Sequence, residues 1–160
     1  MPKDGFFEFE GDKEIVLTCD FGAPRDLVFK ASTDPELVPR WWGPANLKTT
    51  VDKMDVREGG EWRFVQQDKD GNEFAFSGVY REVSPPGRLV YTFNFELMPG
   101  HESVETITFE EKDGVTTFRD VVRFQSREDR DGMAQSGMKE GAGETMDRMA
   151  ALLRELQGPI

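Results

Sequence analysis

The hydrophobic period changes once along this chain, at Ser126, and this change limits the folds open to it. Upstream of Ser126, short segments alternate apolar and polar residues between Gly- or Pro-containing turns, as antiparallel strands do. The clearest is RLVYTFNF (88–95), where every second residue is large and apolar. Downstream, apolar residues recur at three- and four-residue steps, typical of a helix of roughly 30 residues. Since sheet and helix each have one apolar face, the sequence predicts an α+β fold in which one covers the other.

The N-terminal third supplies one more strand and two short helices. EIVLTCDF (14–21) alternates as a strand does, and a Gly-Ala-Pro break follows it. PRDLVFKAS (24–32) predicts a helix that begins at proline, where the missing N–H costs nothing. PELVPRWW (35–42) predicts a second helix, which Pro39 should keep short. Six strands then follow between 47 and 124, so the predicted order is strand, two helices, six strands and one long helix.

Five motifs resemble, in order and spacing, the activator-of-Hsp90-ATPase-like family of the START/Bet v 1-like (SRPBCC) superfamily. They are APRDLVFKASTDPELVPRWWGP, REGGEWRF, FSGVYREVSPPGRLVYTF, TTFRDVVRF and GMKEGAGETMDRMAALL. The resemblance implies a helix-grip fold: a curved seven-stranded antiparallel sheet wrapped around the long C-terminal helix, with the two short helices between strands 1 and 2. We expect one START/Bet v 1-like domain over 1–160, with its core at about 13–157.

Relatives in that superfamily often hold an apolar ligand between sheet and helix. A strongly curved sheet cannot lie flat on a helix, so large side chains or a ligand must fill the space between them. Small and flexible residues on the helix are compatible with a ligand. The alternative, which the sequence favours, is that the glycines let the helix approach the sheet closely and the methionines fill gaps in the core. The predicted cavity residues are Trp42, Trp62, Phe64, Phe76, Tyr80, Tyr91, Phe93, Phe118, Met138, Ala142 and Met146.

The adjacent tryptophans Trp41 and Trp42 must have different roles if they lie on a helix. Neighbouring residues on a helix point about 100° apart. We expect Trp41 to pack inward with Leu37, four residues earlier, and Trp42 to lie nearer the entrance of the cavity. Gly43-Pro44 should then turn the chain into the sheet.

Asp120 is the one candidate for acid–base chemistry. In FRDVVRF it shares a strand face with Phe118 and Val122, so an inward face would place a carboxyl in apolar surroundings and raise its pKa. A salt bridge to Arg119, Arg123 or Arg63 is the alternative interpretation. One His and one Cys are too few for the usual zinc sites, and we predict no metal and no cofactor.

Charge and composition exclude several partners. A formal net charge of −11 disfavours nucleic acid and anionic membrane surfaces. No apolar run approaches the roughly 20 residues of a membrane span. The acidic N-terminus does not resemble a signal peptide, and a single cysteine, Cys19, is typical of a reducing compartment, so we expect a cytoplasmic protein.

Three functional hypotheses follow. The first is binding of a small apolar ligand or lipid in the cavity. The second, implied by the resemblance, is an Hsp90-type co-chaperone or protein-interaction module. The third is a cavity enzyme of polyketide-cyclase type that uses the buried carboxylate. The sequence favours a binding protein over an enzyme.

Overall fold

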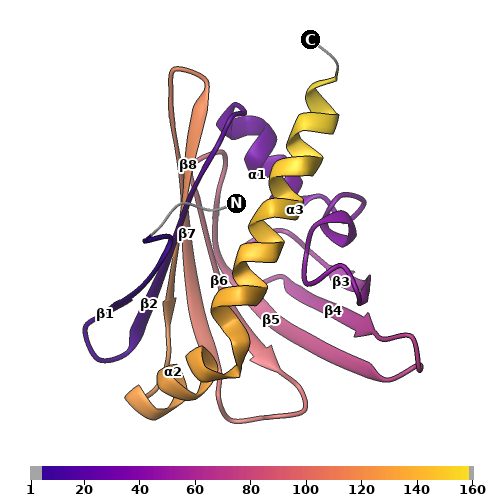
Figure 1. Cartoon of the computed structure of the whole chain (residues 1–160), viewed down its shortest axis with the longest axis vertical. Coiled ribbons are helices and arrows are strands. Elements are labelled where there is room, and N and C mark those ends of the chain that lie inside the picture. Colours follow the sequence, from indigo (N-terminus) through magenta and orange to yellow (C-terminus); the bar gives the residue numbers. More distant parts are fainter. Residues whose placement is uncertain (1–4, 159–160) are drawn as a thin grey trace.

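The alternating segments form one antiparallel sheet in the computed structural model, which describes residues 5–158 (Figure 1). The strands are β1 (Phe7–Glu10), β2 (Glu14–Phe21), β3 (Lys48–Met54), β4 (Glu61–Gln67), β5 (Glu73–Ser84), β6 (Arg88–Phe95), β7 (Ser103–Lys112) and β8 (Val115–Arg123). Their order in the sheet is β1-β2-β8-β7-β6-β5-β4-β3. Strands β3 to β8 are neighbours in sequence order, and β2 closes against β8. The predicted α+β helix-grip fold is therefore confirmed.

The sheet has eight strands, one more than the sequence analysis predicted. The additional strand, β1, pairs with β2 in a hairpin, with Phe7 opposite Leu17 and Phe9 opposite Ile15. Gly11 turns the hairpin with a positive φ of 57°, which glycine adopts without a steric cost. β1 has only four residues, two of them acidic, so its short alternation does not stand out in the sequence.

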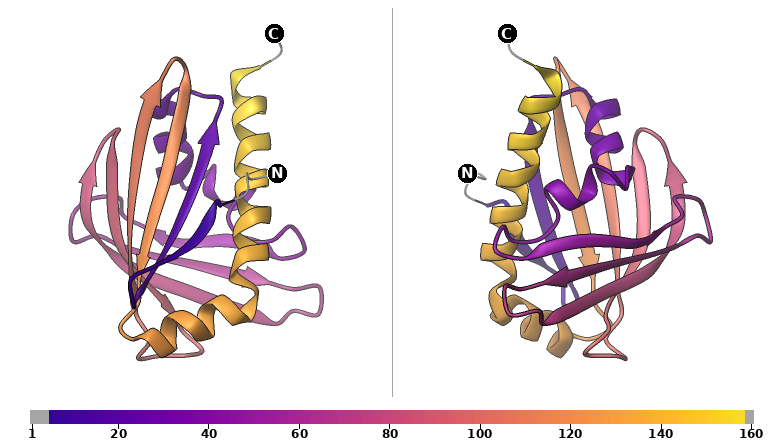
Figure 2. Two further views of the ribbon diagram at one scale, coloured as in Figure 1. Left: turned by 60° about the vertical axis from the view of Figure 1, so that its left-hand side comes forward. Right: turned by 90° about the vertical axis from the view of Figure 1, so that its right-hand side faces the viewer.

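The long C-terminal helix is bent rather than continuous. α2 (Arg127–Met133) is followed by a π-helical turn, η2 (Ala134–Met138), and then by α3 (Lys139–Gln157). Gly137 has a φ of 96°, which interrupts the helix and lets α2 lie across the end of the sheet while α3 runs along it (Figures 1 and 2). The predicted start is confirmed, because the Ser126 hydroxyl accepts a hydrogen bond from the Asp129 N–H at 3.0 Å.

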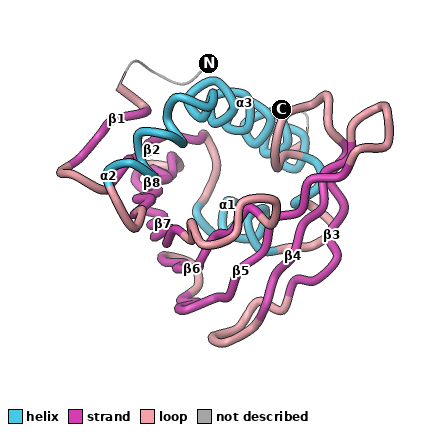
Figure 3. The backbone as a smooth tube through the Cα atoms, turned by 90° about the horizontal axis from the view of Figure 1, so that it is seen from below, coloured by secondary structure: helices cyan, strands magenta, loops and turns pink. Residues whose placement is uncertain are grey.

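The two short N-terminal helices are α1 (Arg25–Thr33) and the 3₁₀ turn η1 (Val38–Arg40). Pro39 limits η1 to a single turn, as expected for a residue that lacks an N–H donor. Viewed from below, the strands curve around α3, and α1 lies inside the curve opposite it (Figure 3).

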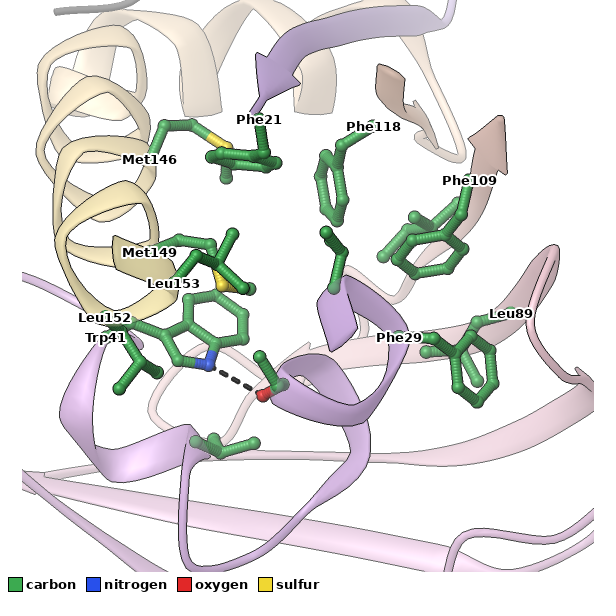
Figure 4. Packing of buried hydrophobic residues seen from close by; sticks show 14 of the residues in the cluster. Phe21, Phe29, Trp41, Leu89, Phe109, Phe118, Met146, Met149, Leu152 and Leu153 are labelled. Carbon is green, nitrogen blue, oxygen red and sulfur yellow. Dashed lines mark hydrogen bonds between the residues drawn. The ribbon is translucent and has the colours of Figure 1, made fainter. Parts of the chain in front are cut away.

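The hydrophobic core has two parts. The larger packs the second half of α3, including Met149, Leu152 and Leu153, against α1, Trp41 and the aromatic residues of the sheet (Figure 4). The smaller joins β2 and β8 to the bent segment of the helix through Ile15, Leu17, Val122 and Phe124, with Met138 packed against them. Residues of both clusters face the space between sheet and bent helix, which is where the candidate site lies.

Candidate functional site

A cavity of about 480 Å³ lies between the concave face of the sheet and the bent helix. Ligand cavities in proteins typically measure about 300–1,000 Å³. All the cavity residues predicted from the sequence line it: Trp42, Trp62, Phe64, Phe76, Tyr80, Tyr91, Phe93, Phe118, Met138, Ala142 and Met146. Core packing alone therefore does not fill the space under the curved sheet. That a ligand occupies it stays a prediction.

Aromatic rings from β4, β5 and β6 form one wall of the cavity. Trp62 packs against Phe64 and Tyr91, with ring centroids 4.8 and 5.7 Å apart. Trp42 meets Phe64 and Phe76 edge-on at 5.1 and 5.2 Å. The Trp62 indole also donates a hydrogen bond to a β6 carbonyl at 3.2 Å. Because the rings support one another, the wall is preformed rather than dependent on a ligand for its shape.

The two tryptophans separate as predicted. Trp41 is 7% exposed, and its indole N–H donates to the Ala31 carbonyl in α1 at 2.8 Å (Figure 4). Trp42 is only half-buried and lines the cavity. The two rings thus serve the core and the cavity respectively.

The segment after Trp42 is attached to α3 by polar contacts. The Arg148 guanidinium donates to the carbonyls of Gly43 and Arg40, at 2.5 and 3.1 Å. One turn earlier on the helix, the Glu144 carboxylate accepts the Ala45 N–H at 2.5 Å. This side of the cavity rim is therefore fixed to the helix that forms the opposite wall.

Asp120 lies on the cavity face of β8 and is 5% exposed. Burial raises the pKa of its carboxyl well above the ordinary value, and the neighbouring Glu105 carboxylate raises it further through its charge and by accepting a hydrogen bond from protonated Asp120. Within residues 5–158, Asp120 Oδ1 is a buried oxygen with no hydrogen-bond partner. The site therefore contains a carboxyl that keeps its proton far more readily than an exposed aspartate does.

The alternative of an Asp120 salt bridge is wrong, because the three candidate arginines pair with other carboxylates. Arg119 pairs with Glu10 at 3.7 Å, and Arg123 with Glu14 at 3.5 Å. Arg63 pairs with Glu96 at 2.9 Å and with Asp52 at 3.2 Å. Successive side chains of a strand point to opposite faces, so Arg119 cannot share the cavity face with Asp120.

Glu105 of β7 is a cavity residue that the sequence analysis missed. Its carboxylate accepts a hydrogen bond from the Tyr91 hydroxyl at 3.0 Å. Burial, followed by the Glu105 charge, raises the pKa of Tyr91 well above its ordinary range, so the phenol remains a donor. The available signal was the alternation in SVETITFEEK, where Glu105 shares a strand face with buried Ile107 and Phe109.

Along residues 5–158, no group of three or more His, Cys, Asp or Glu side chains is placed to hold a metal ion. None of the helices described is both long enough and apolar enough to cross a membrane.

A curved antiparallel sheet closed by a long C-terminal helix, with a cavity between them, defines a helix-grip protein of the Bet v 1-like (SRPBCC) class. The chain belongs to the family described as "Activator of Hsp90 ATPase homolog 1-like protein", whose family model matches residues 22–154. No curated protein matches the chain.

Solved structures share this fold over nearly the whole chain. A Rhodobacter sphaeroides protein is 22% identical with a TM-score of 0.87, covering 92% of this chain and 97% of its own. Ms6760 of Mycobacterium smegmatis is 26% identical with a TM-score of 0.82, covering 92% and 94%. DynU16, titled a putative protein in the dynemicin biosynthetic locus, is 23% identical with a TM-score of 0.71, covering 91% of this chain and 48% of its own.

Proposed function

We propose that this protein binds a small, mainly apolar molecule in the cavity between the sheet and the bent helix. The observation that carries the proposal is the cavity of about 480 Å³, which remains open although the surrounding aromatic rings pack closely. Empty apolar volume is destabilising, since its lining loses van der Waals contacts. A ligand of matching shape restores those contacts, and the family's fold is compatible with this role.

The lining also limits the ligand's size and shape. Trp42, Trp62 and Phe93 offer flat apolar surfaces that suit a ring system. Met138 and Met146 on the helix have flexible, polarizable side chains that adapt to different ligand outlines. We expect a ligand with a rigid, ring-containing body, of the size of two to three fused rings.

Native mass spectrometry of the gently purified protein, with extraction of any co-purifying molecule, tests occupancy directly. A second arm measures binding of 2-naphthalenemethanol, a neutral two-ring probe, by isothermal titration calorimetry. We expect a single saturable site with a negative heat-capacity change, the sign of apolar surface being buried.

A matched pair of variants locates the binding. Ala142→Phe places a ring in the cavity, whereas Ala151→Phe places the same ring on the exposed side of α3. Ala142→Phe should abolish probe binding and Ala151→Phe should leave it unchanged, with urea unfolding verifying that both variants fold. Equal binding by the two variants would place the probe outside the cavity and refute the proposal.

Catalysis in the same cavity is a second candidate function, and Asp120 is the observation that favours it. A carboxyl that keeps its proton can act as a general acid towards a bound substrate, as in a polyketide-cyclase type of reaction. For any substrate found by extraction, Asp120→Asn should leave the fold intact and remove turnover. Turnover that survives the substitution excludes this role.

The family description names activation of the Hsp90 ATPase, and chaperone binding is the remaining alternative. Its support is the family membership alone. The ATPase rate of an Hsp90-type chaperone, measured with and without the purified protein, tests it. An unchanged rate at saturating protein excludes an activator role.

A further inference from the structure

The polar part of the cavity is a group of two carboxyls and a phenol on three adjacent strands. Asp120 comes from β8, Glu105 from β7 and Tyr91 from β6. Tyr91 satisfies one oxygen of Glu105 through its hydrogen bond of 3.0 Å. Asp120 Oδ1 is left without a hydrogen-bond partner among residues 5–158, although Asp120 is only 5% exposed. A buried acceptor atom of a cavity-lining residue is therefore still unsatisfied.

No cationic side chain of the protein lies beside Asp120 and Glu105 to balance their charge. Among the cavity-lining residues within 5–158, none is Lys, Arg or His. The nearest arginines along β8, Arg119 and Arg123, form ion pairs with Glu10 and Glu14 instead. Burial raises the pKa of Asp120, and the negative charge of the Glu105 carboxylate beside it raises that pKa further. A half-buried negative charge without a counter-ion is unfavourable, and a positively charged ligand group reduces that penalty.

The rings beside the carboxyls also suit a positive charge. Tyr91 packs against Trp62 and Tyr80, with centroids 5.7 and 6.1 Å apart, and all three line the cavity. The faces of aromatic rings carry negative potential and attract cations within about 6 Å. The carboxyls and the ring faces therefore both favour a positive charge on the ligand.

The charge of the whole chain acts in the same direction. A formal net charge of −11 repels anions and attracts cations towards the surface before they enter the cavity. Fatty acids and other carboxylate ligands are disfavoured twice, by this field and by the Asp120–Glu105 pair.

We propose that the ligand is an amphipathic amine, whose apolar body lies against the aromatic wall and whose ammonium group donates hydrogen bonds to Asp120 and Glu105. This inference rests on the proposed binding function and specifies its ligand class. An ammonium has three N–H donors, enough to serve the Asp120 and Glu105 side chains together.

Three probes with one naphthalene body test the inference: 2-naphthylmethylamine, 2-naphthalenemethanol and 2-naphthoate. Dissociation constants are measured by isothermal titration calorimetry at pH 7 and physiological salt, which screens general attraction to the acidic surface. Hydrogen bonds to charged groups contribute enough that we expect the amine to bind about 10- to 100-fold more tightly than the alcohol. The naphthoate should bind most weakly.

Charge-matched variants assign the preference to the cavity. Glu105→Gln removes the negative charge beside Asp120 and should reduce the ratio of alcohol to amine dissociation constants to below about threefold. The control is Glu110→Gln, which removes the same charge from an exposed position of the same strand, β7, and should keep the wild-type ratio.

The outcomes are separable. If alcohol and amine bind equally well, the amine proposal is overturned while ligand binding in the cavity stands. If the amine preference persists in Glu105→Gln, the attraction is not due to the Asp120–Glu105 pair and the inference is overturned. If none of the probes binds, the proposed function is overturned together with it.

Discussion

Replacing Asp120 with asparagine should remove a contribution to folding stability that falls as pH rises. The substitution keeps the size and shape of the side chain and removes the titratable group in the cavity. Burial and the Glu105 charge raise the pKa of Asp120 in the folded protein well above 3.8, the value expected when the chain is unfolded. Between these two pKa values the folded chain holds a proton that the unfolded chain has released, so its stability falls as pH rises.

The magnitude follows from the proton count. Each pH unit in that window lowers the free energy of unfolding of the wild type by about 1.4 kcal/mol relative to the variant. Asp120 therefore contributes its full stabilisation below pH 3.8, and this contribution is lost as pH rises towards the folded-state pKa. Two units into the window the difference is about 2.7 kcal/mol, or roughly 5–10 °C in Tm for a chain of this length.

Urea unfolding of both proteins between pH 4 and pH 8 measures this effect. Other carboxylates titrate in both proteins, so the difference between the two stability curves isolates Asp120 and its coupling to Glu105. Glu110→Gln on the exposed face of β7 is the control and should give a curve parallel to the wild type. Parallel curves for Asp120→Asn and wild type would refute the reasoning, because they would mean that Asp120 ionises normally inside the cavity.

Four further substitutions test how the walls and the helix bend are built, each measured by urea unfolding. Trp41→Phe removes an indole donor 2.8 Å from a carbonyl of α1 and should cost about 1–3 kcal/mol; no loss would mean that this hydrogen bond is dispensable. Gly78→Ala places a methyl group 1.8 Å from a β6 carbonyl oxygen and should cost more than about 2 kcal/mol, so a stable variant would contradict the close approach of β5 and β6. Gly137→Ala should cost about 1–2 kcal/mol because of the positive φ, whereas Gly132→Ala in α2 should stabilise by about 0.5–1 kcal/mol; equal effects would argue against the bend.

The fold was predictable because its main signals are local. Alternation marked seven strands, and the three- and four-residue steps marked the C-terminal helix. The bend was not predictable, because a glycine within a helical pattern indicates weak propensity but not whether its φ is positive. At Gly137 the tertiary structure selects the left-handed conformation, and no neighbouring residue in the sequence indicates it.

The candidate site was predictable in its apolar part and less so in its polar part. Aromatic residues alternate strongly enough to place rings such as Trp62 and Tyr91 on one face. Glu105 follows the same alternation. Because a charged residue is ordinarily solvent-exposed, its residue type did not predict a position in the cavity. The predicted salt bridge between Asp120 and Arg119 was wrong because the two residues are adjacent in one strand. Arg119 must therefore face the other side of the sheet.

The two sides of the cavity rim differ in how they are attached to α3. Glu144 and Arg148 fasten the Trp42 side to α3, so that side moves only together with the helix. On the other side, Ser136 and Gly137 are exposed lining residues at the junction of α2 and α3. α2 itself is held in place, since the Arg130 guanidinium donates to the Gly11 carbonyl at 2.7 Å and Asp129 pairs with His101 at 2.8 Å. If a ligand exchanges through this side, its rate should depend on these α2 contacts and on the backbone at Gly137, whereas its affinity depends on the walls.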